Sequence, residues 1–376
     1  MTDIWFWQNI LSPHVASLVS ELACNGYRVT YVAEQSLSKD RIDQGWLISE
    51  MDQVNVVYVQ SKYEVSQLVK KTSTNSIHIS AGLRSIGIVN FAQKELRNLN
   101  RKQWVLMESI SNKGLIGILK QLYYKQLIYL KFKNLIGILA IGSQTKDWLV
   151  KVGFPSEKIY SFAYFLPGYQ PLISEKKFNI QTKRFRFIFV GQFIKRKNLK
   201  LLIDSLSLMK DYDFEFIVVG SGNLERELQS YAELKLPGKL LWRGKLPQSQ
   251  VMHMISEVDC LVLPSFFDGW GAVVSESLLV GTPAICSNTC GSSNIVKASR
   301  VGGVFSNNNQ DSLTKLLINQ IKEGFISIEK RKKIVEWSNI LKASSGAKYL
   351  KQIINYSENK SDSLPEDFLK ANKLKF

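Results

Sequence analysis

Two acids on either side of a glycine-rich turn are the residues best placed for binding chemistry. Asp268 and Glu276 lie eight positions apart in PSFFDGWGAVVSESLLVGTP, with Gly269 and Gly271 between them. The stretch leaves an apolar, strand-like run and enters a helical pattern. Glycines let a ligand approach the backbone, and the first N–H groups of a helix attract anions. We therefore expect an anionic or polyhydroxyl ligand, with Glu276 accepting hydrogen bonds from a ribose diol; a tight turn with solvated acids is the alternative.

A basic loop follows another strand-like run. FRFIFVG ends at Gly191, and Lys195, Arg196 and Lys197 then precede a helical pattern that starts at Leu199. Cations at the carboxyl end of a strand and close to a helix N-terminus suit a diphosphate. The residues alone also allow a solvated basic loop.

A third turn, GSG at residues 220–222, joins a strand-like run to a helical one, and Gly244 ends the next strand-like run. The GSG turn resembles a dinucleotide-binding fingerprint but lacks the third glycine at the required spacing. NAD binding is therefore not expected.

Strand-like and helical runs alternate along both halves of the chain and would position these turns. Apolar runs lie at 4–10, 28–34, 54–60, 76–80, 103–109 and 135–143, and again at 185–191, 214–222, 239–244, 260–265 and 283–287. Strands separated by helices in this way form parallel sheets. We expect an α/β protein with two Rossmann-like, doubly wound domains that face each other across a cleft, because open parallel sheets bind ligands at the carboxyl ends of their strands.

The boundary between the two domains is marked by a loss of periodicity, where Pro, Ser and Lys accumulate. We take residues 167–183 as a linker between an N-terminal domain at 1–166 and a ligand-binding C-terminal domain at 184–342. Residues 343–376 are expected to form a C-terminal helix and tail that packs back on the N-terminal domain.

The composition is that of a basic, folded protein. Lys and Arg outnumber Asp and Glu by 49 to 32, giving a formal net charge of +17. A basic surface attracts nucleotide phosphates, anionic lipid or nucleic acid, and charge alone does not choose among them. The four cysteines lack metal-ligand spacing, so we expect reduced thiols, no metal and a cytoplasmic location. We expect neither a signal peptide nor a membrane-spanning segment.

Four motifs resemble the C-terminal domain of the family-four glycosyltransferases, which have the GT-B fold. They are FVGQFIKRKN, VVGSGNL, LWRGKL and DGWGAVVSESLLVGTP, and the resemblance covers nearly all of residues 185–305. It implies a nucleotide-sugar donor. Lys197 falls on the diphosphate lysine of the family, Gly269 and Gly271 on the turn around the donor sugar, and Glu276 on the ribose-binding glutamate.

Two residues depart from the family pattern. Gln192 stands where the family has a phosphate-binding arginine, and Asp268 replaces the first glutamate of the EX7E pair. We expect Lys195 or Arg196 to supply the missing charge. Asp268 keeps the carboxylate on a side chain that is one methylene shorter, so activity should be retained.

The N-terminal half resembles members of the family that build bacterial surface polysaccharides. In it, His14 follows the first strand-like run and Glu108 ends a later one, and each is either catalytic or structural. The expected catalytic residues are Asp268, Lys197, Glu108 and His14. The expected donor contacts are Gly191, Gln192, Arg196, Lys197, Gly220, Gly222, Gly244, Gly269, Trp270, Gly271, Ala272, Val273 and Glu276.

The resemblance implies metal-independent transfer of a sugar with retention of configuration, in surface polysaccharide biosynthesis. The expected partners are a nucleotide-sugar donor and a saccharide or lipid-linked saccharide acceptor, without a cofactor or nucleic acid. A GT-B-fold sugar-nucleotide epimerase is one alternative, although only three histidines are available for proton transfer. A basic nucleic-acid-binding protein is another, although no recognised module of that kind is present.

The segment from Lys113 to Lys133, KGLIGILKQLYYKQLIYLKFK, is apolar and aromatic, with lysines throughout and no acid. A basic amphipathic helix of this kind lies on an anionic bilayer, which would place the protein peripherally on the inner face of the cell membrane. The alternative is a helix packed on its own sheet whose lysines extend to solvent.

Overall fold

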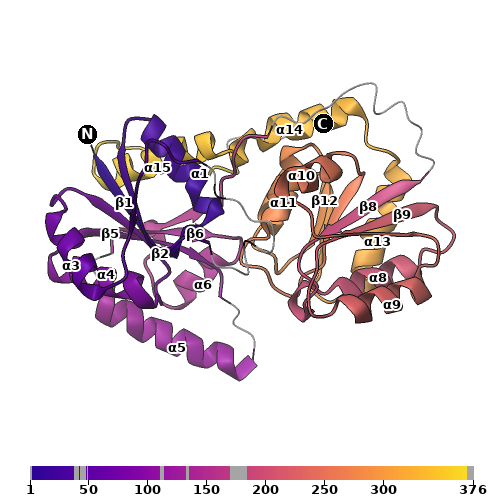
Figure 1. Cartoon of the computed structure of the whole chain (residues 1–376), viewed down its shortest axis with the longest axis horizontal. Coiled ribbons are helices and arrows are strands. Elements are labelled where there is room, and N and C mark those ends of the chain that lie inside the picture. The colour runs from indigo at the N-terminus through magenta and orange to yellow at the C-terminus, as the bar shows by residue number, and fades with distance from the viewer. Residues whose placement is uncertain are drawn as a thin grey trace. The chain divides into compact units, whose positions relative to one another are not determined.

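The computed structural model describes residues 2–37, 42, 48, 50–110, 114–132, 135–169 and 184–370 (Figure 1). The chain divides into two compact units: unit 1 is Met1–Pro167 with Lys342–Phe368, and unit 2 is Gly168–Leu341 with Leu369–Phe376. Most of the expected linker, at 170–183, and the end of the expected tail, at 371–376, lie outside the described residues.

In the described part of unit 1, seven strands form a parallel sheet in the order β3-β2-β1-β4-β5-β6-β7. These strands are β1 (Asp3–Ile10), β2 (Arg28–Gln35), β3 (Asn55–Tyr58), β4 (Ile77–Ala81), β5 (Lys102–Glu108), β6 (Gly137–Ile141) and β7 (Ile159–Phe162). The connecting helices are α1 (Pro13–Cys24), α3 (Lys62–Lys71), α4 (Gly87–Asn98), α5 (Gly114–Lys131) and α6 (Thr145–Lys151). Strands such as β2 and β5 are apolar on both faces because helices cover both sides of the sheet.

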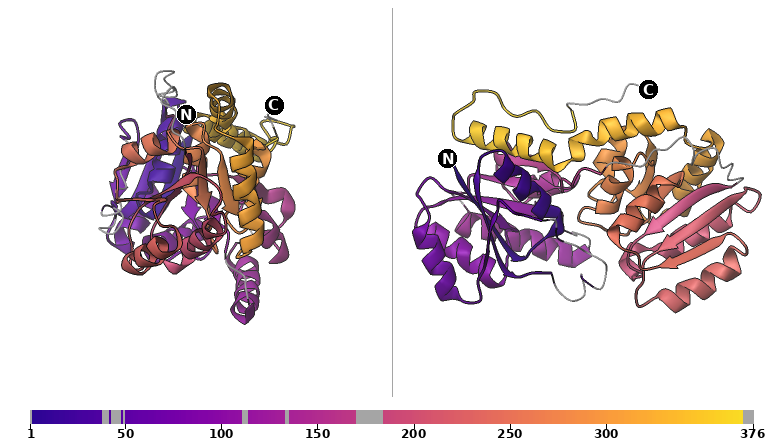
Figure 2. Two further views of the ribbon diagram at one scale, coloured as in Figure 1. Left: turned by 90° about the vertical axis from the view of Figure 1, so that its right-hand side faces the viewer. Right: turned by 45° about the horizontal axis from the view of Figure 1, so that its top comes forward.

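The helix α15 (Ala343–Ser357) belongs to unit 1, although the chain reaches it only after unit 2. It packs against α1, and Figure 2 shows the two helices side by side. The Ala343 amide donates to the Leu166 carbonyl at 2.8 Å, and Lys102 pairs with Glu358 at 2.7 Å. These contacts tie α15 to the N-terminal part of unit 1.

In the described part of unit 2, six strands form a second parallel sheet in the order β10-β9-β8-β11-β12-β13. These strands are β8 (Phe185–Val190), β9 (Phe214–Val219), β10 (Leu240–Gly244), β11 (Cys260–Leu263), β12 (Ala284–Ser287) and β13 (Gly302–Phe305). The helices are α8 (Leu199–Ser207), α9 (Glu225–Lys235), α10 (Gln248–Ser256), α11 (Ala272–Leu279), α12 (Ser293–Ser299), α13 (Gln310–Glu323) and α14 (Ile328–Ser338). Two parallel-sheet α/β units confirm the expected fold class.

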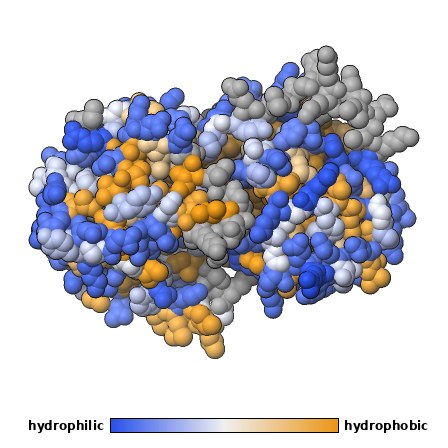
Figure 3. All heavy atoms as spheres, in the orientation of Figure 1, coloured by the Kyte–Doolittle hydropathy of each residue, from blue (hydrophilic) through white to orange (hydrophobic). Residues whose placement is uncertain are grey.

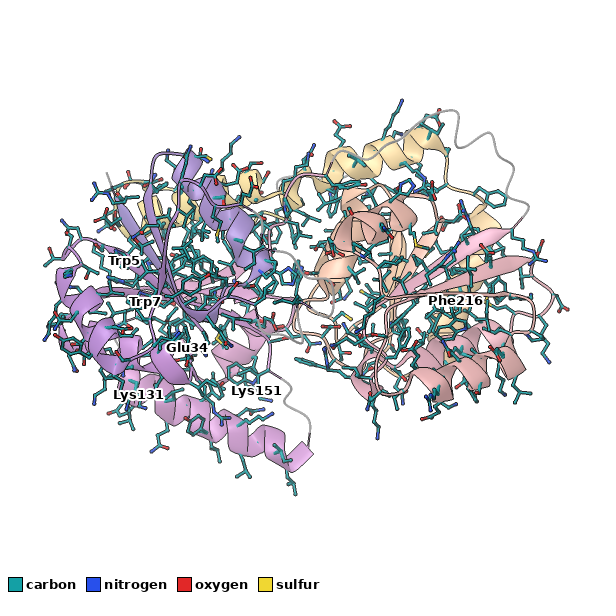
Figure 4. All side chains as sticks on the ribbon, in the orientation of Figure 1. Trp5, Trp7, Glu34, Lys131, Lys151 and Phe216 are labelled. Atoms are coloured by element: carbon teal, nitrogen blue, oxygen red, sulfur yellow. The ribbon has the colours of Figure 1, made fainter. Side chains whose placement is uncertain are left out.

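Phenylalanines from β8 and β9 dominate the core of unit 2. Phe187, Phe189, Phe214 and Phe216 are fully buried, and Figure 4 labels Phe216. The strand β13 was not predicted, because it begins with two glycines, GGVF, and carries little apolar signal. All four cysteines are free thiols, as expected, and three of them are buried.

Strand order reverses between β1 and β4 in unit 1 and between β8 and β11 in unit 2. At such a switch point the chain leaves two neighbouring strands toward opposite sides, and ligands of open α/β sheets bind beside the loops that follow them. In unit 2 these loops hold the basic segment after Gly191 and the acidic turn that starts at Asp268. The two motifs, more than seventy positions apart in sequence, therefore belong to one sheet edge.

Glycines after β9 let the chain pass directly against the loop after β8. A Cβ on Gly220 would lie 1.9 Å from the carbonyl oxygen of Gly191, and one on Gly222 would lie 2.5 Å from that of Phe193. The Gly220 amide also donates to the Gly244 carbonyl at 2.8 Å. Backbone contacts that only glycine permits thus hold together the ends of β8, β9 and β10.

We expect Gly220→Ala to lower the midpoint of urea unfolding much more than Gly238→Ala does. Both glycines have positive φ, but an added Cβ at Gly238 meets nothing within 4 Å. The control therefore carries only the backbone cost of about 1 kcal/mol, whereas Gly220→Ala adds an overpacking cost of roughly 1–3 kcal/mol. Equal midpoints would show that the loops after β8 and β9 do not depend on this close approach.

Candidate functional site

Asp268 is the centre of an ion-paired cluster at the switch point of unit 2. Its carboxylate accepts hydrogen bonds from Lys197 Nζ at 2.6 Å and from Arg196 Nη1 at 3.0 Å. Ser265 Oγ donates to the same carboxylate at 3.1 Å. Only 7% of Asp268 is exposed. Two charge-assisted hydrogen bonds therefore join the loop after β8 to the loop after β11.

The backbone of the acidic turn lies against the turn that precedes α12. The Asp268 amide donates to the Thr289 carbonyl at 3.3 Å, and the Gly291 amide donates to the Asp268 carbonyl at 2.9 Å. A Cβ on Gly291 would lie 1.9 Å from the carbonyl oxygen of Gly269. Contacts from the loop after β8 and from the turn after β12 thus hold Asp268 in position.

The charge state of Asp268 follows from these partners. Burial by itself would raise its pKa, but the charges and hydrogen bonds of Lys197 and Arg196 hold the pKa below its usual value. Asp268 is therefore ionised at neutral pH. The Lys197 side chain is also largely buried, whereas that of Arg196 is 43% exposed. The cluster keeps two cations beside a carboxylate whose oxygens have fixed directions.

The DGWG turn leads into α11, and Gly271 is its N-cap with φ of +83°. The Trp270 ring is buried, and its Nε1 donates to Ser275 Oγ at 3.1 Å, so this residue offers a ligand its backbone and not its ring. Ala272 and Val273 form the first turn of α11. Because the first N–H groups of a helix have no intrahelical acceptor, this end of α11 suits an anion.

Glu276 lies in the second turn of α11 and is partly buried. Gln248 Nε2, at the start of α10, donates to Glu276 Oε1 at 2.8 Å. Desolvation raises the pKa of Glu276 to about 7, against the lowering effects of the Gln248 hydrogen bond and the Lys197 charge. This carboxyl group consequently changes its protonation state near neutral pH.

Gly191, Gln192 and Lys195 border the cluster in the loop after β8. A Cβ on Gly191 would lie 3.8 Å from the Lys197 side chain, so this glycine and Lys197 are neighbours. Gln192 is partly buried and Lys195 is exposed. Besides Lys197, Arg196 is the cation that contacts Asp268. Arg196 is one of the two residues expected to replace the phosphate-binding arginine of the family.

Gly220, Gly222 and Gly244 lie at the ends of the neighbouring strands β9 and β10. A Cβ on Gly220 or Gly222 would meet the protein's own backbone, whereas Gly244 contributes its carbonyl as the acceptor for the Gly220 amide. Glycine at 220 and 222 is therefore required by contacts within unit 2 itself. A role in donor binding remains a prediction.

The two acceptor-side candidates both belong to unit 1. His14 is the second residue of α1, directly after the switch-point strand β1, and its ring stacks on Tyr164 with 5.1 Å between ring centroids. Glu108 is the last residue of β5. Each lies at the carboxyl end of a strand or just after it, and neither belongs to the unit that holds the Asp268 cluster.

Three polar residues of the site were not predicted. Ser265 and Thr289 orient the acidic turn, and Gln248 binds Glu276. Only Ser265 had a usable signal, since it lies within the acidic motif after a buried strand. Gln248 and Thr289 come from other loops, and no spacing rule connects them to the motif.

The described residues include no group of three or more His, Cys, Asp or Glu side chains that is placed to hold a metal ion. Positive charge for an anionic ligand is instead available from Lys197, Arg196 and the N-terminus of α11. The arrangement is suited to binding an anion next to a carboxylate that accepts hydrogen bonds.

We expect Lys197→Met to destabilise the protein by roughly 3 kcal/mol, the lower end of the cost of breaking a buried ion pair, because Arg196 still contacts Asp268. Adding Asp268→Asn should recover much of the lost stability, because it removes the buried carboxylate that Lys197→Met leaves with fewer partners. Urea unfolding of the single and double variants measures both effects. Lys330→Met, which removes the exposed pair with Glu323 at 3.1 Å, is the matched control and should cost under about 1 kcal/mol. Strictly additive effects of Lys197→Met and Asp268→Asn would contradict the coupling.

Glu276→Gln should stabilise the protein above neutral pH and have little effect at acidic pH. The folded pKa of about 7 lies above the ordinary glutamate pKa of 4.5, so the folded state holds its proton more tightly than the unfolded state. Wild type therefore loses stability as the pH rises from 4.5 toward 7. The uncharged variant avoids this loss, and we expect a gain on the order of 2 kcal/mol at alkaline pH. If the unfolding midpoints of wild type and Glu276→Gln differ by the same amount at acidic and alkaline pH, the pKa of Glu276 is not raised.

Comparison with known proteins connects this site to a family. Residues 173–338 match the family described as "Glycosyl transferases group 1". The chain is 27% identical over 197 residues to the UDP-Gal:alpha-D-GlcNAc-diphosphoundecaprenol alpha-1,3-galactosyltransferase of Escherichia coli, which covers 49% of this chain and 50% of that protein. It is 30% identical over 152 residues to the lipopolysaccharide 1,6-galactosyltransferase of Escherichia coli strain K12, with 39% and 42% of the two chains covered. The chain thus spans half or less of the length of these curated relatives.

Similarity of structure extends over both units. The lipopolysaccharide outer core galactosyltransferase WaaB, in its apo form, matches with a TM-score of 0.68 over 96% of this chain and 99% of that chain, at 16% identity. At this identity the likeness establishes the fold, which is GT-B, as predicted. The family match covers the site at Lys197, Asp268 and Glu276 and confirms the predicted resemblance. Residues 173–338 are thus similar to the group 1 glycosyl transferases.

Proposed function

We propose that the protein is a glycosyltransferase that moves a sugar from a nucleotide-diphosphate donor to a saccharide or lipid-linked saccharide acceptor, with retention, in surface polysaccharide biosynthesis. The observation that carries the proposal is the contact of Asp268 with Lys197 and Arg196 at a sheet switch point, next to the N-terminus of α11. Cations, a helix N-terminus and an oriented carboxylate are the groups that a sugar diphosphate requires.

Lys197, Arg196 and the N-terminus of α11 would bind the donor diphosphate. Negative charge develops on the leaving diphosphate as the bond to the sugar breaks, and fixed cations and N–H groups stabilise it electrostatically. We propose that these groups perform this task without a metal ion. Glu276 would accept hydrogen bonds from the ribose, as the family resemblance implies.

Asp268 would orient the donor sugar. Lys197, Arg196 and Ser265 already direct its two oxygens, so the carboxylate is held in position before a sugar hydroxyl donates to it. We assign retention to this reaction from the family resemblance, with the acceptor oxygen attacking from the face of the leaving group. No protein nucleophile is needed in that case.

The named substrates of the relatives guide the choice of donor and acceptor. The Escherichia coli galactosyltransferase has UDP-Gal and a diphosphoundecaprenol-linked sugar in its name. We propose a UDP-sugar as the first donor to test and a polyprenol-diphosphate-linked saccharide as the first acceptor. We also propose that the protein acts in the cytoplasm, where nucleotide sugars are available.

A two-step experiment tests the proposed function. Thermal-shift measurements with UDP-, GDP-, ADP- and dTDP-sugars identify the donor that stabilises the protein, because a ligand of the folded state raises the unfolding temperature. The selected donor is then incubated with and without a lipid-linked saccharide. Nucleotide release that requires the acceptor supports a transferase. Conversion of the donor without acceptor would indicate an epimerase, and steeply salt-dependent DNA binding without nucleotide-sugar binding would indicate a nucleic-acid-binding protein.

We expect Glu276→Ala to weaken nucleotide-sugar binding by about 1–3 kcal/mol, because hydrogen bonds to a charged acceptor are lost. Isothermal titration calorimetry with the donor found in the screen measures the change. Glu329→Ala removes an acid at the start of α14 and is the control that should leave the dissociation constant unchanged. An unaltered dissociation constant in Glu276→Ala would remove this residue from the donor site.

A further inference from the structure

The helix α5 presents large apolar side chains to solvent along its length. Each of the following is more than half exposed: Leu115, Ile118, Leu119, Leu122, Tyr129 and Leu130. We call this set the outer face of α5. Figure 3 shows apolar atoms gathered over this helix at the bottom of the view. Contiguous exposed apolar surface of this kind marks an interaction site.

The opposite side of α5 already packs on unit 1. Gly117, Tyr124, Leu127 and Ile128 are buried, and the Tyr124 ring meets Trp148 of α6 edge-on with 4.7 Å between centroids. Residues spaced by three or four positions share one side of a helix, which separates the buried set from the outer face. Packing on the sheet therefore accounts for the inner side of α5 only, and the apolar outer face needs another explanation.

The charges of α5 indicate what covers the outer face. Lys120, Lys125 and Lys131 lie on the helix, and no acid occurs between Gly114 and Lys131. Lys113 and Lys133, which extend the basic pattern in the sequence, lie outside the described residues. Figure 4 labels Lys131 on this helix and Lys151 on the neighbouring α6.

Two arginines add to the positive charge around α5. The Arg84 guanidinium lies 5.8 Å from the centre of the Tyr123 ring, and that of Arg97 lies 5.3 Å from the centre of the Phe132 ring. An acid-free apolar surface with cations around it is complementary to anionic headgroups above acyl chains. A second copy of this surface would instead bring like charges together.

We propose that α5 docks on an anionic lipid bilayer, with its outer face toward the acyl chains and its lysines at the level of the headgroups. No helix in the described residues is long and apolar enough to cross a membrane, so α5 would lie in the plane of the interface. At eighteen residues it is about 27 Å long. This docking goes beyond the proposed sugar transfer, since the surface belongs to unit 1 and contains none of the donor-site residues. Its use in reaching a lipid-linked acceptor rests on the proposed function.

Vesicle co-sedimentation tests the docking without a donor or an acceptor. The full chain is mixed with vesicles of phosphatidylcholine and phosphatidylglycerol, or of phosphatidylcholine alone. We expect binding to the anionic vesicles, and a loss of roughly tenfold or more in the triple variant Leu115→Gln, Leu119→Gln, Leu122→Gln. The matched control is Tyr63→Gln, Ile86→Gln, Leu234→Gln, which changes three equally exposed apolar side chains outside α5 and should bind like wild type. Circular dichroism verifies that both triple variants are folded.

Charge is tested separately with Lys125→Gln, Lys131→Gln. This variant should bind less at low salt, and the salt dependence of its remaining binding should be weaker than that of wild type. Wild type that ignores anionic vesicles at low salt would overturn the proposal. A second result would also overturn it. In this result wild type sediments as a dimer, the Leu115→Gln, Leu119→Gln, Leu122→Gln variant sediments as a monomer, and wild type does not bind vesicles. Nucleotide-sugar binding should be the same in all these variants, which separates a failed docking from a failed transferase assignment.

Discussion

The buried carboxylate of Asp268 is the constraint on which the site depends. A carboxylate that is 7% exposed stays charged only if cations and hydrogen-bond donors replace water, and Lys197, Arg196 and Ser265 do so. Meeting this requirement brings together the loops after β8 and β11. The same contact leaves two cations next to the first turn of α11. The electrostatic need of one side chain thus organises the binding surface proposed for a sugar diphosphate.

Close backbone contacts make that arrangement possible. Gly220 and Gly222 lie against the loop after β8, and Gly291 lies against the carbonyl of Gly269. From the sequence, the motif glycines were interpreted as positions where a ligand approaches the backbone. Several of them are also needed because another segment of the protein's own backbone lies too close for a side chain. Lys197 and Asp268 are in contact without a ligand, and such preorganisation lowers the cost of ordering a site during binding.

Unit 1 carries a surface of a different nature. The inner side of α5 is tied to α6 through Tyr124 and Trp148, whereas Leu115, Leu119 and Leu122 remain exposed. Polar ion pairs dominate the site in unit 2, and apolar area with positive charge dominates α5. A transferase that uses a lipid-linked acceptor would need both kinds of surface, one for a water-soluble donor and one for the bilayer that holds the acceptor.

The alternation of strands and helices, the two α/β units and the family motifs could be predicted from the sequence, because periodicity and short motifs are encoded by neighbouring residues. These motifs include Lys197, Asp268 and Glu276. It missed β13, whose two glycines weaken the pattern. Three features became visible only in the folded chain: Arg196 pairs with Asp268, Gln248 donates to Glu276, and one side of α5 stays exposed. Each of these depends on segments distant in sequence that meet in space, and on which groups remain in water after they meet. No local pattern contains that information.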